Sequence, residues 1–253
     1  MLTVLLLGAS SGVGKALLRR NDALKQFRFV IPDGRNGKWR MGEHLDLQSI
    51  DFVIHLAHDR KMNEHEFNTL NLNLIQQIKV PILYLSSMSA HQDAQSAYGR
   101  TKFLAEQLVL QKHGIVLKSG IICGEEPFGI YRTIKILAKS PFTILPSSTN
   151  ALFFAVKLEE LVECILNHLH SFLPGVYFSS NEKVFAFQDL LSVISHHASR
   201  TVRIPDKLFN KIVWLASKFL GSQFRERVNV LYENPPRLEF CTHKCSFTPV
   251  FDN

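Results

Sequence analysis

The first strand and the turn after it constrain the fold of this chain more than any other sequence feature. Residues Leu2–Leu7 form a short apolar run, which is typical of a strand buried on both faces of a sheet. The segment 8–14 (Gly-Ala-Ser-Ser-Gly-Val-Gly) follows as a glycine-rich turn, and residues 15–18 begin a helical pattern. The sequence therefore predicts that the chain opens with a strand, a tight turn and a helix.

Apolar runs and helical segments keep alternating through residue 123. Strands are expected at Phe27–Ile31, Asp51–Ala57, Val80–Leu85 and Ile115–Cys123, and helices at Phe67–Ile78 and Tyr98–Lys112. This alternation predicts an α/β fold of the Rossmann type, a doubly wound parallel sheet whose ligands bind at the carboxyl ends of the strands. Beyond residue 124 the pattern weakens. We therefore expect a dinucleotide-binding core at 1–124, with a small C-terminal substrate-binding part at 125–253 packed on it as one compact unit.

The composition is that of a single globular domain. The chain has 253 residues, of which 46% are hydrophobic and 20% charged, and this excludes a disordered or collagen-like protein. No apolar run approaches the ~20 residues that span a bilayer, and Met1–Leu7 lacks the basic flank of a signal peptide. A cytoplasmic protein without a transmembrane segment is therefore expected.

The basic charge and the cysteines indicate neither a nucleic acid partner nor a metal site. The formal net charge is +7, but the basic residues occur in pairs and triplets, and no nucleic-acid-binding motif accompanies them. The four cysteines are too few and too unevenly spread for a secreted disulfide framework. Cys241 and Cys245 could form half of a zinc site, but a closed site needs four ligands and no second pair exists. We expect no metal and no nucleic acid.

The glycine turn predicts a site for a dinucleotide. Glycines remove Cβ atoms where a pyrophosphate must approach the backbone, and the helix that follows points its N-terminal amides at that anion. Asp33 comes about 20 residues later, just after the second strand, where a carboxylate accepts hydrogen bonds from ribose hydroxyls. This favours NAD over NADP, although Arg35 could bind a 2′-phosphate, so that NADP stays open.

Two further features lie at the expected ligand edge of the sheet. Tyr98 and Lys102 are four residues apart, so their side chains share one face of a helix. A free tyrosine has a pKa of about 10, and a nearby cation favours the phenolate, which suits Tyr98 to act as an acid or base. Ser86 and Ser87 end the preceding strand, where a hydroxyl group could hydrogen-bond a substrate oxygen.

This ordered set of motifs resembles the short-chain dehydrogenase/reductase superfamily, and its extended branch, the NAD-dependent epimerase/dehydratase family, is most similar. The resemblance covers residues 1–124 and adds His55-Leu56-Ala57, Asn71, Asp46-Leu47 and the segment 119–124 (Ser-Gly-Ile-Ile-Cys-Gly). It implies that Tyr98 is the catalytic acid/base and that Lys102 lowers its pKa and holds the nicotinamide ribose. It also implies that Ser87, with Ser89 as the second choice, binds the reacting oxygen. The implied cofactor-binding residues are Gly8, Ser10, Ser11, Gly12, Val13, Gly14, Asp33, Arg35, Asp46, Leu47, Leu56, Ala57, Asn71, Tyr98 and Lys102.

The resemblance also implies a reaction. We expect an NAD(P)-dependent oxidoreductase or epimerase that acts by hydride transfer on a hydroxyl or keto carbon, above all of a nucleoside-diphosphate sugar. Met88-Ser89 stands where sugar-nucleotide 4,6-dehydratases carry an acidic pair, which argues against dehydration. If the protein is a different enzyme, the alternative is a reductase of a small or lipid-like carbonyl compound. If it is not an enzyme, the alternative is a regulator that senses nicotinamide cofactors. A homodimer is expected by the resemblance alone.

The segment 206–221 combines a wide apolar stripe with interspersed lysines. Such a helix could make a peripheral contact with a membrane, form a subunit interface or pack within its own chain. Packing within the chain is the commonest arrangement for an apolar stripe.

Overall fold

A parallel sheet lies at the centre of the computed structural model, which describes residues 1–34, 39–59, 62–139, 142–147, 152–180, 184–195, 200–220, 228 and 243–244. Its seven strands have the order β13-β10-β5-β4-β3-β1-β2, and every neighbouring pair is parallel. They are β1 (Thr3–Leu7), β2 (Arg28–Val30), β3 (Phe52–His55), β4 (Ile82–Ser87), β5 (Ile115–Ser119), β10 (Gly175–Ser179) and β13 (His243–Lys244). Arg35, Cys241 and Cys245 lie outside the described residues.

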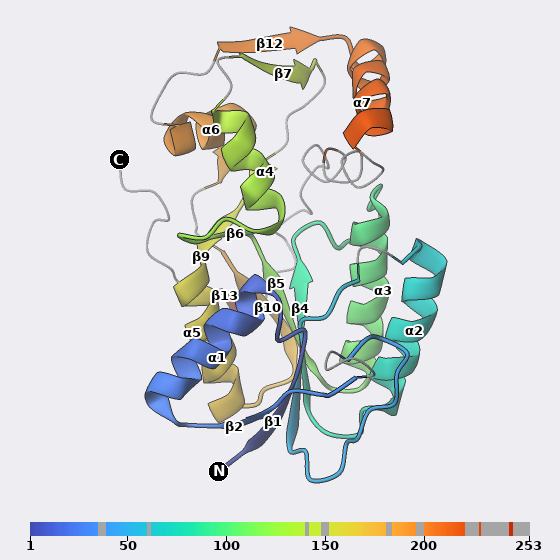
Figure 1. Cartoon of the computed structure of the whole chain (residues 1–253), viewed down its shortest axis with the longest axis vertical. Helices are drawn as coiled ribbons and strands as arrows, with labels where there is room; N and C mark the ends of the chain where they lie inside the picture. The colour runs from blue at the N-terminus through green and yellow to red at the C-terminus, as the bar shows by residue number, and fades with distance from the viewer. Residues whose placement is uncertain are drawn as a thin grey trace.

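Helices cover both faces of this sheet (Figure 1). One face carries α1 (Gly12–Leu24) and α5 (Leu158–His170), and the other carries α2 (Glu64–Gln77) and α3 (Ala97–Gln111). Along β1, Val4 and Leu6 pack with α1 and α5, while Leu5 and Leu7 pack with α2 and α3. The continuous apolar run of the first strand is therefore explained, because both of its faces are buried.

The connections change direction between β1 and β3. From β1 the chain moves to β2 on one side, whereas β4 and β5 follow β3 on the other side. In sheets of this kind, ligands bind at the carboxyl ends of the strands, at the point where the strand order reverses. The predicted doubly wound α/β fold is confirmed, and the expected binding edge is formed by the ends of β1, β3 and β4.

The strand expected at Ile115–Cys123 is two strands. β5 ends at Ser119, and β6 (Ile121–Cys123) leaves the sheet to pair with β9 (Ala155–Lys157). Gly120 allows this change, because a Cβ atom there would lie 2.6 Å from the Phe154 carbonyl oxygen. The main chain thus passes from the sheet into a second lobe at a glycine.

The second lobe has its own apolar clusters, separate from those that flank the parallel sheet. Its elements are α4 (Gly129–Ala138), β7 (Phe142–Pro146), β8 (Leu152–Phe153), β11 (Phe185–Ala186), α6 (Phe187–Ser195), β12 (Arg200–Ile204) and α7 (Asp206–Leu220). Figure 1 shows this lobe beyond the carboxyl edge of the sheet. The second half of the chain also supplies α5 and β10 to the core, so the proposed division at residue 124 does not separate the two lobes completely.

No described helix is both long and apolar enough to cross a membrane.

Candidate active site

The glycine turn is held tightly between β1, α1 and the end of β3. Gly8 has a φ of 90°, and a Cβ atom on it would lie 2.8 Å from the backbone nitrogen of Ala57. A Cβ atom on Gly14 would lie 2.5 Å from the Gly8 carbonyl oxygen. Ser11 caps α1, because its hydroxyl group accepts a hydrogen bond from the Gly14 amide at 3.0 Å. Two of the three glycines are therefore required by backbone packing.

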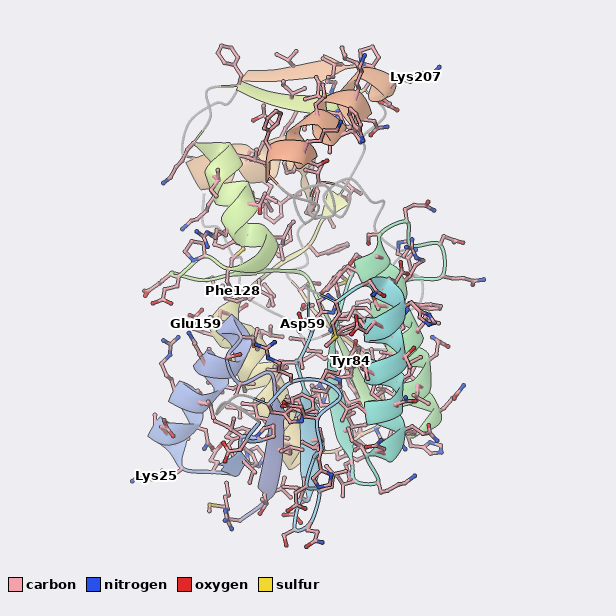
Figure 2. All side chains as sticks on the ribbon, turned by 45° about the vertical axis from the view of Figure 1, so that its right-hand side comes forward. Lys25, Asp59, Tyr84, Phe128, Glu159 and Lys207 are labelled. Atoms are coloured by element: carbon pink, nitrogen blue, oxygen red, sulfur yellow. The ribbon has the colours of Figure 1, made fainter. Side chains whose placement is uncertain are left out.

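Gly12, the middle glycine of the turn, faces an aromatic ring instead of backbone. A Cβ atom on Gly12 would lie 2.6 Å from ring carbons of Phe128, the residue that precedes α4. In Figure 2, Phe128 lies near the N-terminal end of α1, where the second lobe meets the core. In this fold the middle glycine is the one that lets a pyrophosphate approach closely. The sequence analysis did not identify Phe128, although the glycine that follows it at the start of α4 could have indicated a turn at this position.

The remaining predicted cofactor residues lie along the same edge of the sheet and in the loop after β2. Asp33 is exposed, three residues after the end of β2. Asp46 is exposed and accepts a hydrogen bond from the Gln48 amide at 2.9 Å. Leu47 packs against the core that includes α2, and Leu56 is buried directly behind Gly8. The contacts of these residues with a cofactor remain a prediction.

The predicted pair Tyr98 and Lys102 lies on α3, beside the end of β4. Lys102 is 3% exposed, and its Nζ donates a hydrogen bond to the Leu85 carbonyl oxygen at 2.7 Å. The same Nζ lies 4.4 Å from the centre of the Tyr84 ring and 6.0 Å from that of the Tyr98 ring. Tyr98 itself is half-buried. The structure thus places a buried cation near the ring of a partly accessible tyrosine.

Ser87 and Ser89 lie in one turn at the end of β4. Their hydroxyl oxygens are 3.0 Å apart, and the Ser89 amide donates to the Ser87 hydroxyl oxygen at 3.2 Å. Gly99 on α3 contacts this turn, and a Cβ atom at that position would collide with the Ser89 carbonyl oxygen. Both serines considered for the substrate oxygen are therefore adjacent, and α3 packs closely against the turn that carries them.

A buried polar network holds this turn in place from its core side. The Ser86 hydroxyl donates to the Glu106 carboxylate, and Lys118 Nζ donates to the other Glu106 oxygen at 2.8 Å. Lys118 Nζ also donates to the Ala90 carbonyl oxygen at 2.6 Å. Burial raises the pKa of Glu106, and the Lys118 ammonium opposes that increase. The sequence analysis missed this pair, because nothing in the spacing of residues 106 and 118 indicates that they meet.

A second polar group lies behind Tyr98 and Lys102. His55 Nε2 donates to the Asn71 side-chain oxygen at 2.8 Å, and the His55 ring packs edge-on to Tyr84. His55, Asn71 and Tyr84 are at most 1% exposed. Burial and then the charge of Lys102 lower the pKa of His55 to about 3. Asn71, predicted to contact the cofactor, therefore already has a buried hydrogen-bond partner in the core.

The neutral buried His55 predicts an acid-sensitive fold. Its folded pKa lies below the ordinary value of 6.5, so stability is complete above pH 6.5 and falls as the pH decreases towards 3. We expect this group to lower the free energy of unfolding by up to about 2 kcal/mol between pH 6.5 and 5. Urea denaturation at both pH values measures the loss, and the His55→Asn variant should show a smaller dependence. An equal dependence in both proteins would assign the acid sensitivity to other groups.

His58 is a further residue beside Tyr98 that the sequence analysis did not single out. Its ring lies edge-on to the Tyr98 ring at 4.8 Å and against the Phe67 ring at 4.5 Å, measured between ring centres. It follows directly after the His55-Leu56-Ala57 run, so its position just beyond a strand end could have indicated it. The Tyr98 ring is thus bounded by an imidazole on one side and has Lys102 nearby.

Comparison with known proteins gives solved structures of the same fold. No family model and no curated protein sequence matches the chain. The structure is similar to UDP-N-acetylglucosamine 4-epimerase from Bacillus cereus, with a TM-score of 0.61 and 14% identity over 81% of this chain and 86% of that one. It is also similar to ADP-L-glycero-D-manno-heptose-6-epimerase from Helicobacter pylori, with a TM-score of 0.62 and 16% identity over 81% and 85% of the two chains.

A third similar structure is a reductase. It is dTDP-4-dehydrorhamnose reductase from Bacillus anthracis in complex with NADP, with a TM-score of 0.62 and 15% identity over 83% of this chain and 87% of that one. The agreement covers 81–83% of this chain in the three comparisons, so it is not limited to residues 1–124. The chain therefore has the same fold as these three enzymes, in agreement with the Rossmann-type α/β fold that its motifs predicted.

Proposed function

We propose that the protein is an NAD(P)-dependent epimerase or keto-reductase that acts on a nucleoside-diphosphate sugar. The observation that carries this proposal is the arrangement at the end of β4. There, buried Lys102 is fixed by the Leu85 carbonyl oxygen. Half-buried Tyr98 lies on α3, the same helix as Lys102, and the Ser87 hydroxyl lies at the end of β4. The glycine turn lies at the same edge of the sheet. The similar structures named above act on nucleotide sugars or their derivatives, which supports this choice of substrate class.

The side chains have distinct roles in this proposal. Tyr98 exchanges a proton with the substrate oxygen through its phenolic oxygen. Lys102 provides the positive charge that favours the phenolate and also binds the ribose of the cofactor. Ser87 donates a hydrogen bond to the reacting oxygen. The nicotinamide would accept or donate the hydride when bound.

The turn at 8–14 fits a dinucleotide with one condition. Gly8 and Gly14 give the backbone path that this fold uses, and α1 begins immediately after the turn. Phe128, however, contacts the face of Gly12 on which a pyrophosphate would rest. We therefore expect a bound diphosphate either to displace the Phe128 ring or to lie in contact with it. Asp33 is exposed three residues after β2, and in this proposal its carboxylate binds a ribose hydroxyl of the cofactor.

Titration with NADH and NADPH tests the cofactor site. We expect NADH to bind more tightly than NADPH to the wild-type protein, and Asp33→Ala to weaken NADH binding by about tenfold, because a charged hydrogen bond to the ribose is lost. Nicotinamide fluorescence measures both affinities. The matched control is Asp22→Ala, which removes an exposed carboxylate of α1 at the far end of that helix and should leave both affinities unchanged.

The outcomes separate the proposals. A preference for NADPH would transfer the ribose role from Asp33 to residues such as Arg35 and would favour a biosynthetic reductase. Binding of neither dinucleotide would remove the enzyme proposal. If NADH binds but nucleotide sugars neither react nor compete while apolar ketones are reduced, the substrate class is wrong and the reductase alternative is correct.

A further inference from the structure

One side of α7 exposes a row of large apolar side chains. We call this row the α7 stripe; it consists of Leu208, Ile212, Leu215 and Phe219. The spacing of four, three and four residues aligns them along one side of the helix. They are between 39% and 89% exposed, with Phe219 the most exposed. An apolar stripe of this length on a helix normally packs against the protein core or a partner, whereas this one is exposed.

A different side of α7 attaches the helix to the lobe. Phe209 and Val213 are buried, and they pack with Val228 and with Ile204 of β12. The helix therefore already has the apolar contacts that hold it in place. Among the described residues, the α7 stripe belongs to none of the buried apolar clusters and adds exposed apolar surface.

Lysines border the α7 stripe along one edge. Lys207, Lys211 and Lys218 each directly precede a residue of the stripe, and all three are exposed. Because neighbouring helix positions are about 100° apart, the three lysines form a row parallel to the stripe. Next to this row lies Trp214, 44% exposed, with Lys218 Nζ 3.9 Å from its ring centre. An apolar strip with a lysine row and a tryptophan beside it is the composition of a helix that lies at a membrane surface.

The position of α7 allows contact with a flat surface. Figure 1 shows α7, β7 and β12 at one end of the long axis of the molecule, away from the parallel sheet. The ribbon of β7 and β12 adds the exposed side chains Phe142, Ile144 and Val202, of which Ile144 and Val202 are register partners. An end of the molecule can meet a plane without a collision with the core.

We propose that α7 docks the protein on an anionic lipid bilayer, with the α7 stripe among the acyl chains and the lysine row among the lipid phosphates. The charge of the helix favours this partner over a second copy of the chain. α7 carries three lysines but only one acidic residue, Asp206, so two copies pairing through the stripe would bring like charges together without compensation. This proposal does not depend on the reaction proposed above.

Vesicle co-sedimentation of the full chain tests this proposal. Vesicles of phosphatidylcholine alone are compared with vesicles that contain about one third phosphatidylglycerol. We expect binding to the anionic vesicles that falls steeply with salt. Replacement of all three lysines by glutamine should weaken it on the order of a hundredfold, at about fivefold per lysine. The variant Leu215→Ser/Phe219→Ser should weaken it on the order of a hundredfold through lost apolar burial.

The control variant is Arg19→Gln/Lys25→Gln/Lys79→Gln, which removes the same charge from exposed positions on α1 and at the end of the core, and it should bind as the wild type does. A second measurement needs only Trp214→Phe: brominated lipid should quench the wild-type tryptophan fluorescence more than that of the variant. Absence of wild-type binding to anionic vesicles, or equal loss in the control, would overturn the proposal. A concentration-dependent dimer that the stripe variants abolish, without vesicle binding, would assign the stripe to a second copy.

Discussion

Replacement of Tyr98 by phenylalanine should lower kcat by about 10²–10⁴-fold, while the Kd for NADH changes by less than about twofold. The substitution removes one phenolic oxygen and keeps the ring that packs against His58. The chemical step then lacks its acid or base, whereas the glycine turn and Lys102 are untouched. Steady-state turnover on the nucleotide sugar found by screening, together with nicotinamide fluorescence, measures the two effects separately.

Tyr177→Phe is the matched control for this prediction. Tyr177 lies on β10, and its hydroxyl group donates to the Leu173 carbonyl oxygen at 3.0 Å, so the same atom is lost from a residue outside the proposed site. We expect unchanged turnover in this variant. Retained turnover in Tyr98→Phe would exclude Tyr98 as the acid/base and would direct attention to His58, whose ring contacts that of Tyr98.

Local patterns were sufficient to predict the order of strands and helices from β1 to β5. The βα units could be read because each apolar run and each helix is continuous in sequence, and the four-residue spacing of Tyr98 and Lys102 alone places them on one helix face. The glycines could be read because a turn with these constraints admits little else at Gly8 and Gly14. The structure explains this constraint, because backbone atoms of residues 8 and 57 occupy the space that side chains at positions 14 and 8 would need.

Long-range contacts and the second lobe could not be predicted in the same way. Phe128 meets Gly12 across more than a hundred residues, and no spacing rule connects the two. The strands β8 and β11 have two residues each, which is too short for an alternating pattern to be recognised. The break of the strand at Gly120 depends on the approach of Phe154, which belongs to a distant segment. These features arise from tertiary packing, so they become visible only once the fold is known.

Replacement of Lys118 by methionine should lower the free energy of unfolding by about 3–5 kcal/mol at pH 8, because it leaves the Glu106 carboxylate buried without its cation. Glu106 and Lys118 have side chains only 4% and 10% exposed, so water cannot replace the lost partner. The loss should be smaller at pH 5. Burial already raises the pKa of Glu106, and removal of Lys118 raises it further, so the carboxyl group can take up a proton as the pH falls.

Urea denaturation of the wild type, the single variant and Lys118→Met/Glu106→Gln at both pH values separates charge from packing. The double variant removes both charges and keeps an oxygen that can accept from the Ser86 hydroxyl, so we expect it to recover most of the stability and to lose the pH dependence. A double variant as unstable as the single one would show that Lys118 acts through the Ala90 carbonyl oxygen instead. That result would still matter for the site, because Ala90 follows the turn of Ser87 and Ser89, and release of its carbonyl would loosen the hydroxyl groups proposed to meet the substrate.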